Sequence, residues 1–163
     1  MKPAAEKVQA AIVASGLSGK VIELDVHART SQQAADALGV EVAQIAKSLV
    51  FVVDGAPIMV VASGDNRVVE RKVSALAGGT IRRANPDLVK QATGYSIGGV
   101  PPFAHASPLR VWIDRDLGRH AVFYAAAGLP ECVFPLNLDE LVRASGGMVA
   151  DVKQDLPLRG GQS

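Results

Sequence analysis

Two apolar runs separated by a polar turn dominate the pattern of hydrophobic and polar positions in this chain. Residues 48–53 and 57–62 are almost entirely apolar and rich in β-branched side chains, and Asp54-Gly55 lies between them. Two such runs around an Asp-Gly pair predict a β-hairpin. Because neither run alternates with polar residues, we expect both strands to be covered on both faces.

Shorter helices and strands are predicted on either side of the hairpin. Thr30 and Gln33 match a capping box at the start of a helix, and Asn85 followed by Pro86 marks the start of another. The expected helices cover residues 3–15, 30–38, 40–46, 69–77, 86–93 and 138–144, and the further strands cover residues 21–24, 80–83, 111–113, 121–124, 132–134 and 148–152. This order predicts an α+β or mixed fold, because it contains too many hairpin-like neighbours for a doubly wound sheet.

The composition limits the class of protein. At 163 residues the chain is expected to form one domain spanning residues 1–163, with a tail that frays from about residue 155. Apolar residues make up 48% and charged residues 20%, which argues against a disordered chain. The net charge of +1 excludes a broad nucleic-acid-binding surface, so a nucleic acid would have to be held locally.

Sequence features also bear on the compartment. The chain has a single cysteine, Cys132, which cannot form an intramolecular disulfide. Charged residues interrupt the N-terminal stretch, so it lacks the apolar region of a signal peptide, and no apolar run reaches the roughly 18–20 residues of a membrane span. We therefore expect a cytoplasmic protein with no membrane contact.

One lysine and one glycine-proline loop are the strongest candidates for chemistry. Lys47 lies where a helical pattern gives way to an apolar run, so the scaffold is expected to hold its ammonium group. The loop from Tyr95 to Pro108 has no helical or strand period, and Gly98-Gly99 in it can expose backbone N–H groups that stabilise an oxyanion. The plain alternatives are a solvated surface lysine and an ordinary surface turn.

Other residues support chemistry less well. Asp65 lies in a polar turn that could contact a ribose or an amine, although ordinary turn chemistry is the favoured explanation. Cys132 lies in an apolar run, where a cysteine is usually inert. The three histidines lack metal-ligand spacing, and the chain contains no nucleophile elbow, phosphate loop or dinucleotide fingerprint. We expect neither a metal nor a cofactor.

Taken together, these stretches resemble the YbaK/EbsC family, which are freestanding relatives of the editing domain of bacterial prolyl-tRNA synthetases. The matching stretches are residues 28–30, 34–35, 44–51, 61–65, 92–102, 113–114 and 126–128. The resemblance covers nearly the whole chain and implies a mixed, barrel-like β-sheet flanked by helices. It also implies hydrolysis of a mischarged tRNA, typically tRNA(Pro) carrying Cys, Ala or another small amino acid, with the tRNA acceptor end and prolyl-tRNA synthetase as partners.

The resemblance also suggests which residues form the site. The residues assigned to catalysis are Lys47, Gly98 and Gly99, and those assigned to substrate binding are Asp65, Tyr95, Val100, Pro101, Pro102, Ala126 and Gly128. Two positions depart from the family pattern. Residues 125–127 are all alanine where some relatives have a serine, and Ala104 stands where many have glycine. The first departure suggests a less polar pocket wall.

Two other functions fit the same residues. The absence of an obvious acid or base is compatible with a non-catalytic module that binds a nucleotide or a synthetase. A hydrolase of small esters or thioesters would act equally well without the tRNA body. Editing itself has a clear physical basis, because one methylene separates two substrates by only about 1–3 kcal/mol in an apolar pocket.

Overall fold

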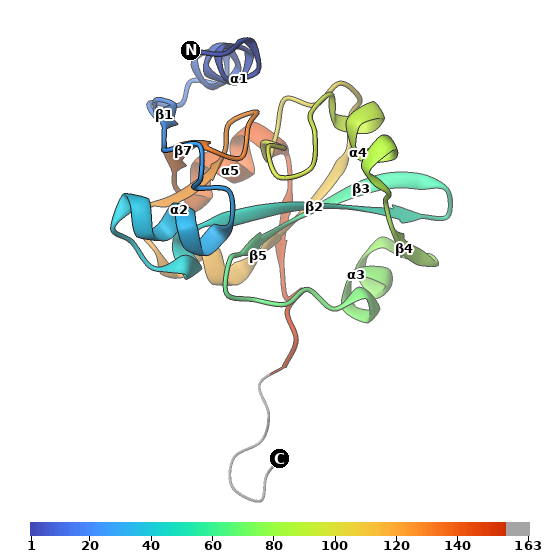
Figure 1. Ribbon diagram of the computed structural model, residues 1–163. Coiled ribbons are helices and arrows are strands. Elements are labelled where there is room, and N and C mark those ends of the chain that lie inside the picture. Colours follow the sequence, from blue (N-terminus) through green and yellow to red (C-terminus); the bar gives the residue numbers. More distant parts are fainter. Residues whose placement is uncertain (156–163) are drawn as a thin grey trace, which may run out of the picture.

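The predicted hairpin forms the centre of the larger of two β-sheets in the computed structural model, which describes residues 1–155 (Figure 1). Its strands are β2 (Ala46–Val53) and β3 (Ala56–Ser63), which pair along their whole length. Asp54 and Gly55 both have positive φ angles, of 48° and 85°. A tight two-residue turn that matches the twist of its strands requires such angles, and Asp-Gly supplies them at low cost.

The other strands complete two sheets, and the helices lie around them. The larger sheet has the order β4-β2-β3-β5-β8 and the smaller sheet the order β1-β7-β6. The remaining elements are α1 (Pro3–Ala14), β1 (Ile22–Glu23), α2 (Ser31–Leu38), the 3₁₀ helix η1 (Val42–Gln44), α3 (Glu70–Ala77), β4 (Ile81–Arg83), α4 (Pro86–Thr93), β5 (Arg110–Asp114), the 3₁₀ helix η2 (Arg115–Arg119), β6 (Phe123–Ala126), β7 (Cys132–Leu136), α5 (Leu138–Ser145) and β8 (Met148–Ala150).

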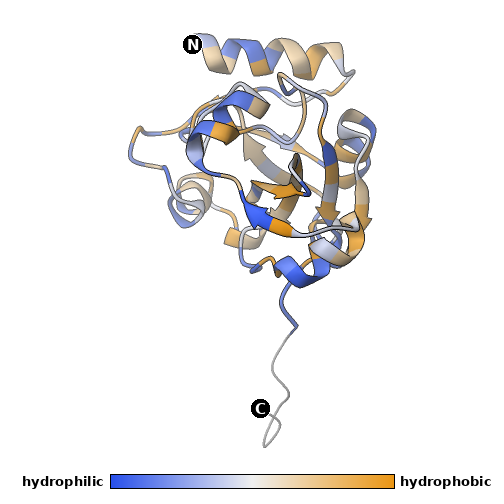
Figure 2. Cartoon of the chain, turned by 90° about the vertical axis from the view of Figure 1, so that its right-hand side faces the viewer, coloured by the Kyte–Doolittle hydropathy of each residue, from blue (hydrophilic) through white to orange (hydrophobic). Residues whose placement is uncertain are grey.

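Each face of the larger sheet is covered by its own hydrophobic core, as expected from the continuous apolar runs. Val50 and Met59 belong to a large cluster shared with α1, the smaller sheet and α5. Phe51 and Val60 point the other way and pack with Val73 of α3. Figure 2 shows hydrophobic residues concentrated on the central strands and hydrophilic residues on the helices and loops around them. The central hairpin is therefore the rigid support on which the rest of the chain packs.

Most of the predicted elements are confirmed, with three differences. The helix expected at residues 40–46 is reduced to η1, because Ala46 already pairs with Ser63 across the hairpin. The 3₁₀ helix η2 was not predicted from the sequence. The third difference concerns the barrel-like sheet that the family resemblance implies, because the strands of residues 1–155 form two sheets that do not close into a barrel. The α+β class is confirmed.

The two ends of the described chain lie far apart. Figures 1 and 2 show α1 at one end of the molecule and the segment leading to residue 155 at the other. Asp155, where fraying was expected to begin, accepts a hydrogen bond from Lys72 Nζ at 2.7 Å, and the rest of the expected tail lies outside the described residues. None of the helices in residues 1–155 has the length and apolar character needed to cross a membrane.

The loop predicted to be functional is anchored at several points. Between α4 and β5 the chain forms neither helix nor strand. The N–H groups of Ala106 and Ser107 donate to carbonyl oxygens of α4 at 3.0 and 3.1 Å. His105 Nε2 lies 2.7 Å from the carbonyl oxygen of Pro101, so the ring nitrogen donates to it. The loop is thus held in one conformation against the body of the fold.

Candidate functional site

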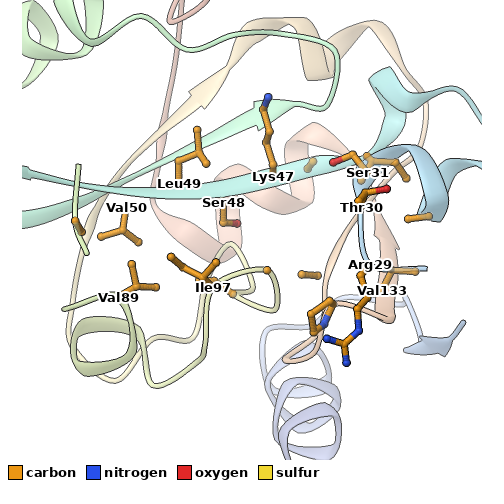
Figure 3. Close-up of a pocket in the computed structure, with 18 of the residues that line it drawn as sticks. Arg29, Thr30, Ser31, Lys47, Ser48, Leu49, Val50, Val89, Ile97 and Val133 are labelled. Atoms are coloured by element: carbon orange, nitrogen blue, oxygen red, sulfur yellow. The ribbon is translucent and has the colours of Figure 1, made fainter. Parts of the chain in front are cut away.

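We call the glycine-proline loop of residues 95–108 the glycine loop. A cavity of about 210 Å³ lies between β2, the start of α2, this loop and the smaller sheet (Figure 3). It is small compared with the pockets that hold drug-sized ligands. Its wall is made mainly of aliphatic side chains, with three cationic residues among them. The lining residues are Arg29, Thr30, Ser31, Ala34, Ile45, Ala46, Lys47, Ser48, Leu49, Val50, Arg83, Ala84, Val89, Ile97, Gly98, Val100, Ala126, Pro130 and Val133.

One wall of the cavity is an unpaired stretch of the β2 edge. On this side of β2, β4 pairs only with residues 51–53, and the N–H of Ala84 donates to the carbonyl oxygen of Val50 at 3.1 Å. At the other end, Ile45 forms a bridge with Tyr124. Between these two contacts, residues 46–49 have no strand partner on this side within residues 1–155. We call residues 46–49 the open edge of β2.

The glycine loop closes the cavity opposite the open edge. Gly98 lines the cavity and has a φ of 91°, which side-chain-bearing residues rarely adopt. Gly99 lies behind it, and its N–H donates to the carbonyl oxygen of Ser96 at 3.0 Å. The expectation that both glycines expose free amides is therefore wrong for Gly99, because a local turn already uses its N–H group.

Gly99 has a packing role that the sequence did not reveal. A Cβ atom on Gly99 would lie 2.6 Å from the carbonyl oxygen of Gly128 and 2.8 Å from Leu129 Cα. The N–H of Gly128 donates to the carbonyl oxygen of Gly99 at 2.9 Å. Gly128 in turn packs against α1, since a Cβ on it would lie 2.6 Å from the carbonyl oxygen of Ala4. These backbone contacts set how far Gly98 reaches into the cavity.

Lys47 lines the same cavity, but its side chain does not face the glycine loop. Figure 3 shows Ser48 and Val50 on the side of β2 that faces Ile97, whereas Lys47 and Leu49 project from the opposite side. This is the normal alternation of side chains along a strand. The ammonium group of Lys47 therefore points away from the glycine loop and does not face its amides.

The surroundings of Lys47 affect its ionisation in opposite directions. Partial burial lowers the pKa of Lys47 most strongly, and the positive charge of Arg83 lowers it further. The carboxylates of Asp65 and Asp114 act against this by favouring the charged form, but the net pKa stays below its ordinary value of 10.5. A partly buried lysine with a lowered pKa is a common feature of functional sites.

The structure gathers some of the predicted site residues and separates others. Lys47, Gly98, Val100 and Ala126 line one cavity. The remaining predicted residues are not part of its lining; they are Asp65, Tyr95, Gly99, Pro101, Pro102 and Gly128. Asp65 instead accepts a hydrogen bond from Ser63 Oγ at 2.9 Å. Tyr95, Pro101 and Pro102 are buried behind the cavity wall, where they support the loop.

Several lining residues were not assigned from the sequence. Arg29 and Arg83 add positive charge at the margin, and Ser48 places a hydroxyl group within the cavity. Arg29 immediately precedes the capping box of Thr30 and Gln33, and Arg83 belongs to a short basic pair, so each is in a recognisable local pattern. Nothing in the sequence places them around the same cavity as Lys47, because the three residues come from separate parts of the chain.

The chemistry available in the cavity is binding and polarisation. None of the lining residues within residues 1–155 is Asp, Glu, His or Cys. The same part of the chain contains no group of three such side chains close enough to hold a metal ion. Cys132 is buried, and burial raises the pKa of its thiol, which keeps it in the unreactive form. The site can bind a small group and orient it, with cationic side chains around the cavity.

The site is thus a small, mostly aliphatic cavity with three cationic residues in its lining, set in a two-sheet α+β fold. The family model described as aminoacyl-tRNA editing domain matches residues 25–144. This protein belongs to the aminoacyl-tRNA editing domain family.

Relatives and solved structures agree with this assignment. The uncharacterized protein YwhH of Bacillus subtilis is 35% identical over 137 residues, covering 83% of this chain and 87% of the relative. Proline-tRNA ligase of Xanthomonas campestris is 30% identical over 100 residues, which span 61% of this chain but 18% of the ligase. The crystal structure of a candidate trans-editing enzyme for prolyl tRNA synthetase superimposes with a TM-score of 0.92 at 41% identity, covering 95% of this chain and 99% of that one.

Proposed function

We propose that this protein hydrolyses the ester bond of a mischarged aminoacyl-tRNA, and that the tRNA is tRNA(Pro) carrying a small amino acid such as Cys or Ala. The observation that carries the proposal is the single small cavity that Lys47, Gly98, Val100 and Ala126 line together in a member of the editing family. The relatives include a proline-tRNA ligase and a candidate trans-editing enzyme for prolyl tRNA synthetase, which supports the choice of tRNA.

The reaction requires little chemistry from the protein. A water oxygen bonds to the ester carbonyl carbon, the bond to the ribose oxygen breaks, and that oxygen takes up a proton. The products are a free amino acid and an uncharged tRNA, with one proton released. Because the ester is already reactive, no protein nucleophile is needed, in agreement with a cavity that has no acidic or basic side chain other than its cations.

The cavity offers a place for each part of the substrate. Its aliphatic part, which includes Val50, Val89 and Ile97, would hold the amino-acid side chain. The cationic residues would hold phosphate or ribose oxygens of the terminal adenosine, with Arg29 on one side of the cavity and Lys47 projecting from the far side of β2. Gly98 also lines the cavity, and its backbone amide would face the ester. A hydroxyl or thiol group of the substrate would assist the attacking water.

The test is deacylation of a panel of purified tRNAs. We expect the protein to accelerate loss of the ester from Ala-, Cys- or Ser-charged tRNA(Pro) over spontaneous hydrolysis, and to leave correctly charged Pro-tRNA(Pro) intact. Adding prolyl-tRNA synthetase to the same assay shows whether that partner is required. Lack of acceleration for every member of the panel, with and without the synthetase, would overturn the proposal.

The absence of an acid or base from the cavity lining favours a second candidate, a non-catalytic module that binds the acceptor end. Such a module would bind charged tRNA(Pro) in a filter-binding assay without ester loss. Hydrolysis of a small aminoacyl ester at the same rate as the tRNA would instead identify an esterase that does not use the tRNA body.

A further inference from the structure

The open edge of β2 places unpaired backbone groups in a cavity whose wall is otherwise mostly aliphatic. The carbonyl oxygen of Val50 points away from β3, because it accepts a hydrogen bond from Ala84 on the β4 side. Backbone groups along a strand alternate in direction with a period of two residues. The N–H and C=O of Ser48 therefore point to this same side, into the gap between the β4 and β6 contacts.

No protein group in the described part of the chain satisfies these two backbone groups. Within residues 1–155, the main chain of Ser48 has no hydrogen-bond partner on the open side. Ser48 is half-buried, and six consecutive residues from Ile45 to Val50 line the cavity. Backbone groups away from bulk water are nearly always paired in proteins, and an unpaired strand edge is a ready template for an additional strand. The ligand is therefore expected to supply the missing partner.

We propose that the aminoacyl group of the substrate pairs with Ser48 as one additional residue on the open edge of β2. The inference rests on the proposed function. An aminoacyl ester carries an α-ammonium group and a carbonyl group in the same relative positions as the N–H and C=O of a residue. In an antiparallel pair, two facing residues exchange both hydrogen bonds. The carbonyl oxygen of Ser48 would accept from the ammonium group, and the N–H of Ser48 would donate to the ester carbonyl oxygen.

This pairing assigns roles to both walls of the cavity. The N–H of Ser48 polarises the ester carbonyl and stabilises its oxygen as negative charge develops. The carbonyl oxygen of Ser48 recognises the free amino group, which every aminoacyl-tRNA has and which an acylated amine lacks. With Gly98 opposite, the scissile ester lies between the open edge and the loop. The N–H of Gly99 cannot take this role because it donates to Ser96. The N–H of Ser48 takes its place in the proposed site.

The first test removes the N–H without removing a sheet hydrogen bond. Proline is tolerated on an edge strand where the N–H faces away from the neighbouring strand, which is the situation of Ser48. We expect Ser48→Pro to lower single-turnover deacylation about 100-fold, the typical loss of one oxyanion donor. Ser48→Ala keeps the N–H and removes only the hydroxyl group, and we expect it to lower the rate by no more than about threefold. Equal losses in the two variants would overturn the main-chain role.

The second test changes the substrate and leaves the protein intact, so it does not depend on how the proline variant folds. Propionyl-tRNA(Pro) has the size of alanyl-tRNA(Pro) but lacks the amino group. Because the propionyl ester is less reactive, each rate is divided by its own spontaneous rate of hydrolysis. We expect this ratio to fall at least about tenfold for the propionyl ester.

The outcomes separate the two proposals. If the protein deacylates no mischarged tRNA, the proposed function fails and the pairing fails with it. If it deacylates alanyl-tRNA(Pro) but accelerates propionyl-tRNA(Pro) equally well, the function stands and the pairing is wrong. A selective loss in Ser48→Pro together with discrimination against the propionyl ester supports the pairing.

Discussion

A single added methyl group at Gly99 tests whether backbone packing behind the loop controls the site. In Gly99→Ala the new Cβ would lie 2.6 Å from the carbonyl oxygen of Gly128, whereas ordinary contacts begin at 3.4 Å. The two backbone segments must therefore separate by about 0.8 Å, the difference between these distances. Both are backbone, so no flexible side chain can absorb the change, and Gly98 moves with its neighbour.

The expected cost follows from two terms. Overpacking of this kind costs about 1–3 kcal/mol. Weakening the hydrogen bond from the Gly128 N–H to the Gly99 carbonyl oxygen, 2.9 Å long, adds about 0.5–1.5 kcal/mol. We expect a loss of about 2–4 kcal/mol in the free energy of unfolding. Since a displacement near 1 Å at a reacting group costs about 100-fold in rate, deacylation should fall by about 10- to 100-fold.

The control is a glycine outside the site at which an added methyl group changes the backbone angle but meets no neighbouring atom. Gly78 ends α3 with a φ of 80°, and a Cβ on it would meet nothing within 4 Å. Gly78→Ala should cost about 1–2 kcal/mol of stability from its backbone angle while leaving deacylation unchanged. Urea unfolding followed by the single tryptophan, the buried Trp112, measures stability, and single-turnover deacylation is measured where both variants are folded. If Gly99→Ala kept full activity, or lost no more stability than Gly78→Ala, the packing account would be refuted.

Three further predictions concern charged residues. Lys47→Ala should lower the rate of deacylation about 10- to 100-fold. It should not lower stability at pH 7, because the lowered pKa of Lys47 means that folding disfavours its charged form. The control is Lys20→Ala at an exposed position, and equal rates in the two variants would remove Lys47 from the mechanism. Arg83→Ala should raise KM and reduce the salt dependence of tRNA binding by about one phosphate contact, and an unchanged salt slope would place Arg83 outside the tRNA path. Burial raises the pKa of Asp116, but hydrogen bonds from Lys153 and Asn66 outweigh it and leave the pKa below 3.8. The stabilisation that ionised Asp116 gives the folded state is therefore complete above pH 3.8 and is lost as the pH falls further. Lys153→Met should lower the free energy of unfolding by about 1–3 kcal/mol at pH 7 and by less at pH 2, as measured by urea titration. A loss that does not depend on pH would contradict the ion-pair explanation.

Most of the helices and strands could be predicted from local sequence patterns. The Asp54-Gly55 turn, the capping box of Thr30 and Gln33, and the Asn85-Pro86 helix start each depend on neighbours within a few residues, so they can be recognised along the chain. Where the prediction was wrong, a distant partner decided the outcome. Ala46 extends β2 rather than a helix because Ser63 pairs with it.

The candidate site could be predicted only in part, for the same reason. Lys47 and Gly98 were found from the sequence as residues in unusual local settings, and both line the cavity. The direction of the Lys47 side chain depends on the pleat of β2, and the use of the Gly99 N–H depends on the turn with Ser96. Arg83 was not assigned to the site, because nothing near it in the sequence indicates its neighbours.

The sequence by itself determined most of the elements, the α+β class, the family resemblance and the two segments that contain the candidate residues, because each of these depends on residue order and spacing over short distances. The tertiary structure alone decided that β2 has an unpaired edge at residues 46–49, since β4 and β6 meet it only at its two ends. The tertiary structure also decided which backbone N–H and C=O groups point into the cavity. A strand edge is open or covered according to where other strands pack, and no local property of the strand records that.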